Sequence, residues 1–488
     1  MCPLGAAVRV WPMSRDRKLT MFLHLNKDKT HLCAQRRSLM WRIHFWAALI
    51  ASPFAVVAAI TGTLYVFTPQ IESALYAHLD QVEVLEKARP FDELVDAARS
   101  AAPHGWTLHS VVPAQRVNES ARFAWMAPRE HAVKPHPAPA ATGHSGHGEH
   151  GAAEPVAKPD KPAFLRPSFG LPNKSLVVYV NPYNAQVLGS LEQSQRFSVW
   201  ARKLHSSWLQ GDGWRWIIEL AASWVMVMLV TGAYLWWPQP HATPVRGAGR
   251  AAWRRWHAWT GVGLSVVTAA ILATGLTWSK NAGERVRWLR DAAGQASPRI
   301  PAHFQSKPVQ GHAPMNWEQA VQAIRQHAPQ VSMQIMPPQG PAGVWRANHI
   351  ERGQPMDRFD LLVDAYSGER LFYSGWDAQT FFGKATGVGI PFHRAELGYW
   401  NQAVLLIFGL GLIFSMVSGW VMYVKRRAMG SVGLPALLPG AWRSPSWGMW
   451  LSAAFMLWAM PMLTLSEPIV AIVEGFKAWR SRGFALAG

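Results

Sequence analysis

The sequence has few cysteines and few charged residues. Cys2 and Cys33 are its only cysteines, and both precede the first long apolar run. A disulfide framework and a thiolate metal site are therefore excluded from the regions that follow. Charged residues make up 16% of the chain and hydrophobic residues 49%, and a soluble protein usually carries more charge. The net charge of +19 comes from basic residues beside apolar runs rather than in one patch, which disfavours nucleic-acid binding. No G-x-G-x-x-G follows a predicted strand, so no flavin or nicotinamide fingerprint is present.

Long apolar runs are abundant. Five of them are long enough to cross a bilayer, which takes about 20 residues each. The 27 tryptophans favour the same interpretation, because indole rings prefer the membrane–water interface. The predicted spans are Trp41–Phe67, Trp216–Trp237, Trp256–Trp278, Trp400–Val424 and Trp447–Leu465.

Basic residues predict the orientation of these spans. Arg36 and Arg37 precede the first span, and the links after the second and fourth spans are rich in lysine and arginine but contain no acid. By the positive-inside rule these three stretches are cytoplasmic. The long connections, about 70–200 and 280–392, then lie outside. Five spans also place the C-terminus outside, although the basic "FKAWRSRG" near the end disfavours that.

Each long connection contains the pattern of a small α+β unit. In the first, Phe91–Ala102 is an amphipathic helix pattern, and "VVYVNPYNAQVLGSL" predicts a hairpin that turns at residues 181–184. In the second, "NWEQAVQAIRQHAP" predicts a helix capped by Asn316. The segment "LLVDAYSGERLFYS" then predicts a hairpin that turns at residues 364–368.

The two halves of the chain resemble each other. Each half contains an inner-face histidine, a span, an α+β unit, an outer-face histidine and a returning span. The fold class predicted is thus an α-helical integral membrane protein with small outer α+β domains and a two-fold internal repeat. The matched positions are His44 with His257, Gly62 with Gly275, Asn181 with Asp364, His205 with His393, and, within one residue, Gly232 with Gly419.

The first half carries an extra segment between about residues 128 and 162. It is rich in proline, alanine and histidine and too polar to pack a core. Within it, "GHSGHGEH" spaces His144, His147 and His150 three residues apart. Such a tract binds divalent metals weakly, or is simply a linker.

Four histidines carry the functional hypothesis. His44 and His257 lie at the inner ends of their spans, and His205 and His393 lie just before the outer ends of theirs. Imidazole is a common axial ligand of haem iron, and two facing helices can hold a haem between them. Two pairs at two depths predict two haems and a path for electrons across the bilayer.

Glycines are placed to accompany these histidines. Gly62 and Gly275 each follow a histidine by 18 residues, which is five helical turns and about 27 Å along one face. They would lie opposite the outer pair and leave room for a flat macrocycle. Close helix packing is the alternative explanation.

Other roles for these residues remain open at this stage. A single histidine at an interface is often an anchor or a packed polar group, and a transition-metal site lacks a convincing third ligand. Arg42 and Arg255 each stand two residues before a histidine. They either neutralise haem propionates or, as we favour, anchor the inner face. Arg202, Lys203 and Arg394 flank the outer histidines against the orientation rule, which favours an anionic partner there.

The motifs "RIHFW…AITGTLYVF", "KLHSSWL…LVTGAYLWWP", "RRWHAWTGV…LATGL" and "PFHRAELGYW…VSGWVMY" resemble those of the PepSY-associated transmembrane family. The resemblance covers about residues 38–430. It implies a multi-pass protein of the bacterial inner membrane with periplasmic PepSY-like domains. Members include ferric-siderophore reductases with two b-type haems, each held by two histidines. The residues at the matching positions are His44, His257, His205 and His393, with Gly62, Gly275, Gly232 and Gly419 beside them.

The resemblance implies a di-haem reductase of ferric siderophore or another iron chelate, supplied with electrons by a membrane quinol or a protein donor. The alternatives are a PepSY module that regulates a periplasmic peptidase, and a metal or siderophore permease.

The predicted organisation is a cytoplasmic leader (1–40), a first span (41–68), a periplasmic domain (69–200), an outer-histidine segment with the second span (201–238), a cytoplasmic link (239–253), a third span (254–279), a second periplasmic domain (280–392), an outer-histidine segment with the fourth span (393–425), a second link (426–446), a fifth span (447–466) and a tail (467–488).

Overall fold

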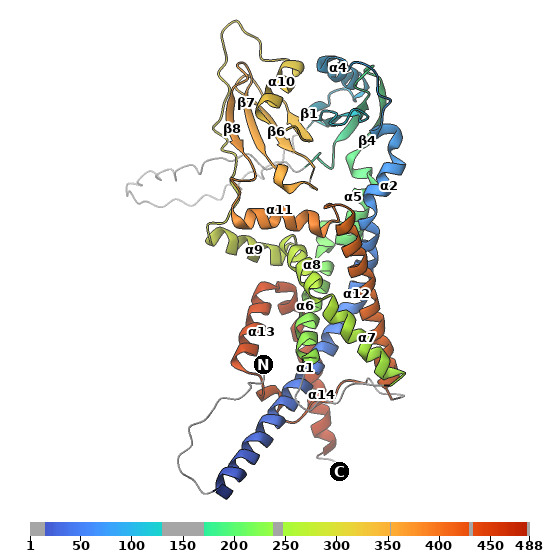
Figure 1. The fold of residues 1–488 in the computed structure, drawn as a ribbon, viewed down its shortest axis with the longest axis vertical. Helices are drawn as coiled ribbons and strands as arrows, with labels where there is room; N and C mark the ends of the chain where they lie inside the picture. Colours follow the sequence, from blue (N-terminus) through green and yellow to red (C-terminus); the bar gives the residue numbers. More distant parts are fainter. Residues whose placement is uncertain (1–14, 129–169, 238–246, 352, 429–432, 486–488) are drawn as a thin grey trace, which may run out of the picture. The chain divides into compact units, whose positions relative to one another are not determined.

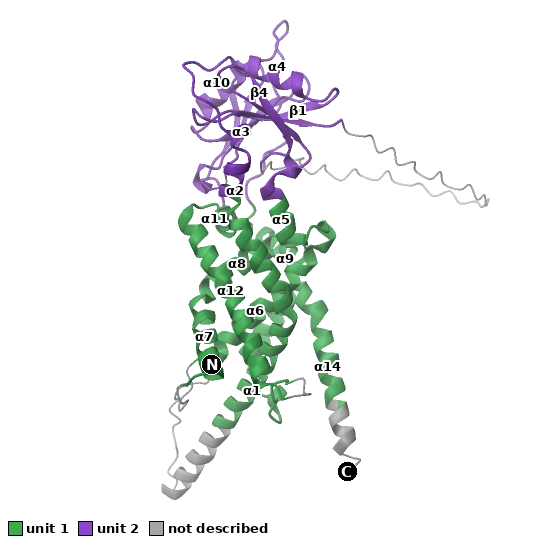
Figure 2. Ribbon diagram, turned by 90° about the vertical axis from the view of Figure 1, so that its right-hand side faces the viewer, with its two compact units in different colours: residues 1–69, 200–296, 385–488 green, residues 70–199, 297–384 purple. Residues whose placement is uncertain are grey.

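The computed structural model describes residues 15–128, 170–237, 247–351, 353–428 and 433–485 (Figure 1). The chain divides into two compact units (Figure 2). The helical unit comprises residues 1–69, 200–296 and 385–488, and the sheet unit comprises residues 70–199 and 297–384. Each unit is thus assembled from segments far apart in the chain. The predicted tract of His144, His147 and His150 lies outside the described residues.

Three long helices form the centre of the helical unit. They are α1 (Arg15–Val66), α6 (Trp216–Trp236) and α12 (Tyr399–Arg426), and α1 packs against both of the others (Figure 1). By length and hydropathy all three are able to cross a membrane. Helix α1 runs without a break through the boundary at residue 40, so the last part of the predicted leader is continuous with the first span.

Two predicted spans are bent helix pairs. α7 (Arg250–Gly263) and α8 (Ser265–Thr277) meet at an angle of 56°. α13 (Trp447–Ala459) and α14 (Pro461–Ala485) meet at 117°, where Pro461 has no N–H to continue the first helix. Counting each pair as one span gives up to five. The predicted fifth span is therefore not one straight helix.

Short helices precede two of the long ones. α5 (Phe197–Ser207) is followed by Trp208 and Leu209, whose φ angles are +51° and +63°. α11 (Phe381–His393) is followed by Ala395 at +59°. This left-handed backbone is unfavourable for residues other than glycine, and it turns the chain from each short helix toward α6 or α12. A further helix is α9 (Asn281–Ala292). At its N-terminus the backbone N–H of Ala282 donates to the buried carboxylate of Glu219.

The sheet unit contains one eight-stranded antiparallel sheet in the order β4-β3-β2-β1-β5-β6-β7-β8. Two separate α+β units were expected, but β1 pairs with β5 through Val111 and Ile335 and joins the two sets of four strands. An unpaired β1 would expose a row of backbone groups at a sheet edge. The strands are β1 (Thr107–Val112), β2 (Ala121–Met126), β3 (Leu176–Val180), β4 (Val187–Glu192), β5 (Met333–Met336), β6 (Val344–His349), β7 (Asp360–Asp364) and β8 (Arg370–Ser374).

Two helices, α4 (Phe91–Ala101) and α10 (Trp317–His327), pack against each other and against the sheet. Each supplies a carboxylate that accepts a hydrogen bond from the first backbone N–H of the other. The Asp92 carboxylate accepts from the backbone N–H of Trp317 at 3.0 Å, and the Glu318 carboxylate accepts from that of Phe91 at 2.7 Å. Both helices were predicted, and the Asn316 cap is confirmed as a full capping box.

Both predicted hairpin turns are also confirmed. Asn181 accepts a hydrogen bond from the N–H of Tyr183, and Asp364 accepts from those of Tyr366 and Ser367. Burial alone would raise the pKa of Asp364, but these donors outweigh it and hold the pKa below its ordinary value. The two turns thus use the same side-chain-to-backbone geometry, two residues before a tyrosine.

Candidate functional site

The four predicted histidines make the same contact in four places. Each lies half-buried against a hydroxyl residue and the glycine that follows it on a neighbouring helix. His44 of α1 lies against Thr231–Gly232 of α6, His205 of α5 against Thr61–Gly62 of α1, His257 of α7 against Ser418–Gly419 of α12, and His393 of α11 against Thr274–Gly275 of α8.

Hydrogen bonds fix which ring nitrogen carries the proton. The distance from Nδ1 to the hydroxyl oxygen is 3.0 Å for His44, 3.1 Å for His205, 2.9 Å for His257 and 3.1 Å for His393. Each hydroxyl has one proton, and each also bonds a backbone carbonyl of its own helix at 2.7–3.0 Å. We infer that the hydroxyl donates to the carbonyl and accepts from Nδ1–H.

His257 provides the clearest case. Its Nδ1 lies 3.1 Å from the carbonyl oxygen of Ser415 as well as 2.9 Å from the Ser418 hydroxyl. A carbonyl only accepts, so Nδ1 is the protonated nitrogen. Nε2 then keeps its lone pair, which is the form of histidine that ligates a metal.

The glycines leave room for the imidazole rings. A Cβ atom at Gly62 would stand 3.2 Å from the Cε1 atom of His205, and one at Gly275 would stand 3.1 Å from that of His393. The corresponding distances are 3.3 Å from Gly232 to His44 and 3.9 Å from Gly419 to His257. The space that was expected to receive a macrocycle is thus filled, at these atoms, by the edge of a histidine.

The rings of the inner pair, His44 and His257, are separated by the distance expected for two ligands of one metal. The ring centres are 6.4 Å apart and the ring planes are at 86°. A metal–imidazole bond is about 2.0–2.1 Å and the nitrogen lies about 1.1 Å from the ring centre, so two rings on opposite sides of one metal have centres about 6.3 Å apart. The residues present therefore fit a bis-histidine haem.

The outer pair, His205 and His393, occupies the other end of the unit. His205 contacts Thr61 and Gly62 of α1, and His393 contacts Thr274 and Gly275 of α8. Thr61, which holds His205, follows His44 by 17 residues on α1, or about 25 Å at 1.5 Å per residue. The two pairs are thus at two levels of the same bundle.

Arg42 takes part in an ion pair next to the inner pair. Its guanidinium forms two hydrogen bonds of 2.9 and 2.8 Å with the Glu474 carboxylate on α14, and it also donates to the carbonyl of Pro435. The indole of Trp46 donates to the same carboxylate. Arg42 is 12% exposed and Glu474 18%. These contacts favour an anchoring role, because they engage the guanidinium within the chain.

Charged residues also stand beside the outer pair. Arg394 donates to the Tyr65 hydroxyl and pairs with Glu396 at 2.8 Å. Burial raises the pKa of Glu396 to about 6, although Arg394 and Arg202 both lower it. An anionic partner was expected for the basic residues here. For Arg394 that partner is Glu396, a residue of the same chain.

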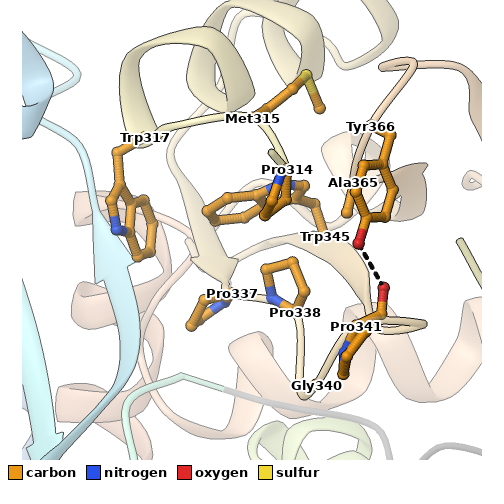
Figure 3. A pocket seen from close by; sticks show the side chains of 10 residues that line it. All are labelled: Pro314, Met315, Trp317, Pro337, Pro338, Gly340, Pro341, Trp345, Ala365 and Tyr366. Carbon is orange, nitrogen blue, oxygen red and sulfur yellow. Dashed lines mark hydrogen bonds between the residues drawn. The ribbon is translucent and has the colours of Figure 1, made fainter. Parts of the chain in front are cut away.

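The sheet unit contains a separate pocket of about 450 Å³ (Figure 3). Trp317 and Trp345 pack edge to face at 4.7 Å, and the Tyr366 hydroxyl donates to the carbonyl of Pro341 at 3.0 Å. None of its ten lining residues is charged. In the part of the chain that the structure describes, no group of three or more histidine, cysteine or acidic side chains is placed to hold a metal ion.

The hydroxyl residues of the site were not predicted from the sequence. Thr61, Thr231, Thr274 and Ser418 each stand directly before one of the four predicted glycines, so the repeated Thr-Gly or Ser-Gly pair was the available signal.

The chain matches a known protein family. The family described as "PepSY-associated TM region" matches residues 41–426. No curated protein matches the chain.

Proposed function

Because the chain belongs to the PepSY-associated TM region family, and is therefore a membrane protein, we propose that it is a di-haem cytochrome that reduces a ferric chelate such as a ferric siderophore. The observation that carries this proposal is the fourfold His–hydroxyl–glycine contact, which leaves four Nε2 lone pairs in two pairs. His44 and His257 would hold one haem, and His205 and His393 the other. Haem held by two imidazoles supplies reversible one-electron chemistry at its iron.

The residues around each histidine have defined tasks in this proposal. The hydroxyls hold the Nδ1 proton, orient the ring and make the imidazole a stronger donor. The glycines let the ring approach the neighbouring helix. The apolar helices exclude water from the path between the two levels. An interface anchor or a permease needs none of these four matched contacts.

The proposed direction of electron flow is from the cytoplasmic side of the bacterial inner membrane to the periplasm. The basic links after the second and fourth predicted spans support it. The repeat of the two halves is part of the same proposal. Its support is the recurrence of the Thr/Ser–Gly contact, the reciprocal capping of α4 and α10, and the strand order.

The test is a visible spectrum of the purified protein in detergent. We expect a sharp Soret band and two haems per chain. His205→Ala should remove one haem and leave the absorbance of the other, and His257→Ala should do the converse. His104→Ala, an exposed histidine of the sheet unit, is the control and should retain both. A colourless wild-type protein, or His205→Ala and His257→Ala variants that keep two haems, would overturn the proposal.

The aromatic pocket of the sheet unit is the proposed site for the organic part of the chelate. Trp317, Trp345 and Tyr366 offer rigid aromatic area, which typically dominates binding energy. We expect Tyr366→Ala to weaken chelate binding about tenfold, or about 1.4 kcal/mol, in calorimetric titration. Tyr183→Ala is the matched control, because Tyr183 occupies the same turn position in the other hairpin. Equal affinities in both variants would exclude this site.

A further inference from the structure

A second pocket lies in the helical unit, between α7 and α12, which lie side by side (Figure 1). Its volume is about 400 Å³, within the range of about 300–1,000 Å³ that small-molecule sites span. Trp253 stacks on Phe414 with ring centres 6.1 Å apart and planes at 23°. The lining residues are Ala252, Trp253, Trp256 and Thr260 of α7 and Phe414 of α12.

This pocket adjoins the inner pair but is distinct from the space between its rings. At about 100° per residue, the four α7 positions lie about 40–140° around the helix from His257, all on one side of it. On α12, Phe414 directly precedes Ser415, whose carbonyl accepts from His257 at 3.1 Å. A molecule in the pocket would thus lie beside His257, flanking a haem held there rather than replacing it.

The chemistry of the pocket selects a particular kind of ligand. Three of its five side chains are aromatic and none is charged, so a flat apolar ring is favoured over a nucleotide or a metal chelate. The Thr260 hydroxyl and the indole N–H groups offer hydrogen bonds to a ring oxygen. Trp256 is 60% exposed on the surface of this apolar unit, so access is from the lipid side.

We propose that this pocket binds the head group of a membrane quinol and that the quinol donates electrons beside His257. This inference rests on the proposed function and names its electron donor. Oxidation of one quinol to the quinone releases two electrons and two protons. The two electrons leave one at a time toward the His44–His257 level, the two protons pass to water, and two Fe(III) chelate ions are each reduced to Fe(II). One quinol is thus balanced by two ferric ions.

Matched tryptophans allow a sharp test. Trp256 lines the pocket and Trp259, on the same helix, does not, yet the two are equally exposed at 60% and 61%. With decylubiquinol as the reductant, we expect Trp256→Ala to slow reduction of the protein at least tenfold. Trp259→Ala should react at the wild-type rate. Both variants should be fully reducible by dithionite.

Two further measurements keep the outcome independent of folding and of haem content. Thr260→Val is isosteric and should slow the decylubiquinol reaction with an unchanged spectrum. An azido-quinone photolabel should attach to the peptide that contains residues 252–260 even in haem-free protein, and Trp256→Ala should reduce the labelling. Labelling elsewhere, or equal rates in the Trp256 and Trp259 variants of a haem-loaded protein, would overturn the quinol site while leaving the di-haem function standing. Protein that never binds haem but labels at 252–260 would instead remove the proposed function.

Discussion

The inner and outer histidine pairs are held by the same contact but in different surroundings. His44 and His257 belong to α1 and α7 and are followed by further helical turns. His205 and His393 lie at the ends of two short helices, next to backbone in the left-handed region. In the inner pair, Nδ1 of His257 has a second acceptor, the carbonyl oxygen of Ser415. His257 is therefore held by two acceptors, whereas His44, His205 and His393 each have one hydroxyl partner at Nδ1.

The largest expected difference is between two of the glycines, Gly275 beside His393 and Gly419 beside His257. Gly275→Ala places a Cβ 3.1 Å from His393, so that ring must move, whereas Gly419→Ala places one 3.9 Å from His257, an ordinary contact. We expect Gly275→Ala to lose the outer haem on purification and Gly419→Ala to keep the inner one. Haem content per chain is the measurement. Equal haem retention in the two variants would contradict this expectation.

The carboxylate partners of the two arginines give the next contrast. At the inner end, Glu474 accepts two hydrogen bonds from Arg42 and ties α14 to α1. Hydrogen bonds to charged groups contribute about 1.5–3 kcal/mol each, so Glu474→Gln should destabilise the helical unit by roughly that amount. Thermal unfolding in detergent measures it. Glu467→Gln, on the same helix, is the control and should leave the midpoint unchanged.

At the outer end the corresponding carboxylate should make stability depend on pH. The pKa of Glu396 is raised by burial to about 6 from an ordinary 4.5. The folded state therefore holds the proton more tightly, and this contribution is fully present below pH 4.5 and is lost as the pH rises through 6. A shift of this size corresponds to about 2 kcal/mol. Thermal unfolding between pH 4.5 and 7 should show the loss, and Glu396→Gln should flatten it. An unaltered pH profile in that variant would assign the dependence to other groups.

The smallest expected effect concerns the hydroxyls. Thr274→Val removes the acceptor of His393 and costs about 1 kcal/mol, which for a one-electron couple is about 40 mV. The weaker imidazole donor should raise the midpoint potential of the outer haem by that amount. Ser418→Ala leaves His257 with the Ser415 carbonyl, so the inner potential should change by less. Spectroelectrochemical titration of both variants measures the two midpoint potentials. Equal shifts in the two variants would contradict this expectation.

Much of this arrangement was predictable, because it depends on local spacing. The 18-residue step from His44 to Gly62 and the capping residue Asn316 follow from helical geometry. The partner of each glycine was not predictable in the same way. Gly62 lies against His205, which is 143 positions away, and only tertiary packing decides that the glycine accommodates an imidazole edge.

Two features of the fold depend on contacts that a single sequence does not display. The pairing of Val111 with Ile335 joins two strands that are 224 positions apart in the chain at these residues. The reversal between α13 and α14 depends on one residue, Pro461, within a run whose hydropathy alone indicates a continuous span. Apolar patterning thus indicates which segments are buried in lipid or protein but not how they turn.

The junction of β1 with β5 has a consequence for how the protein is made. β1 is complete at Val112, whereas its neighbour begins at Met333, and three membrane-directed helices are synthesised between them. During translation the edge of β1 stays uncovered until β5 has been synthesised and can pair with it. Correct placement of α6, α7 and α8 is therefore a prerequisite for completing the sheet, and a chain truncated before Met333 would keep an open, association-prone edge on β1.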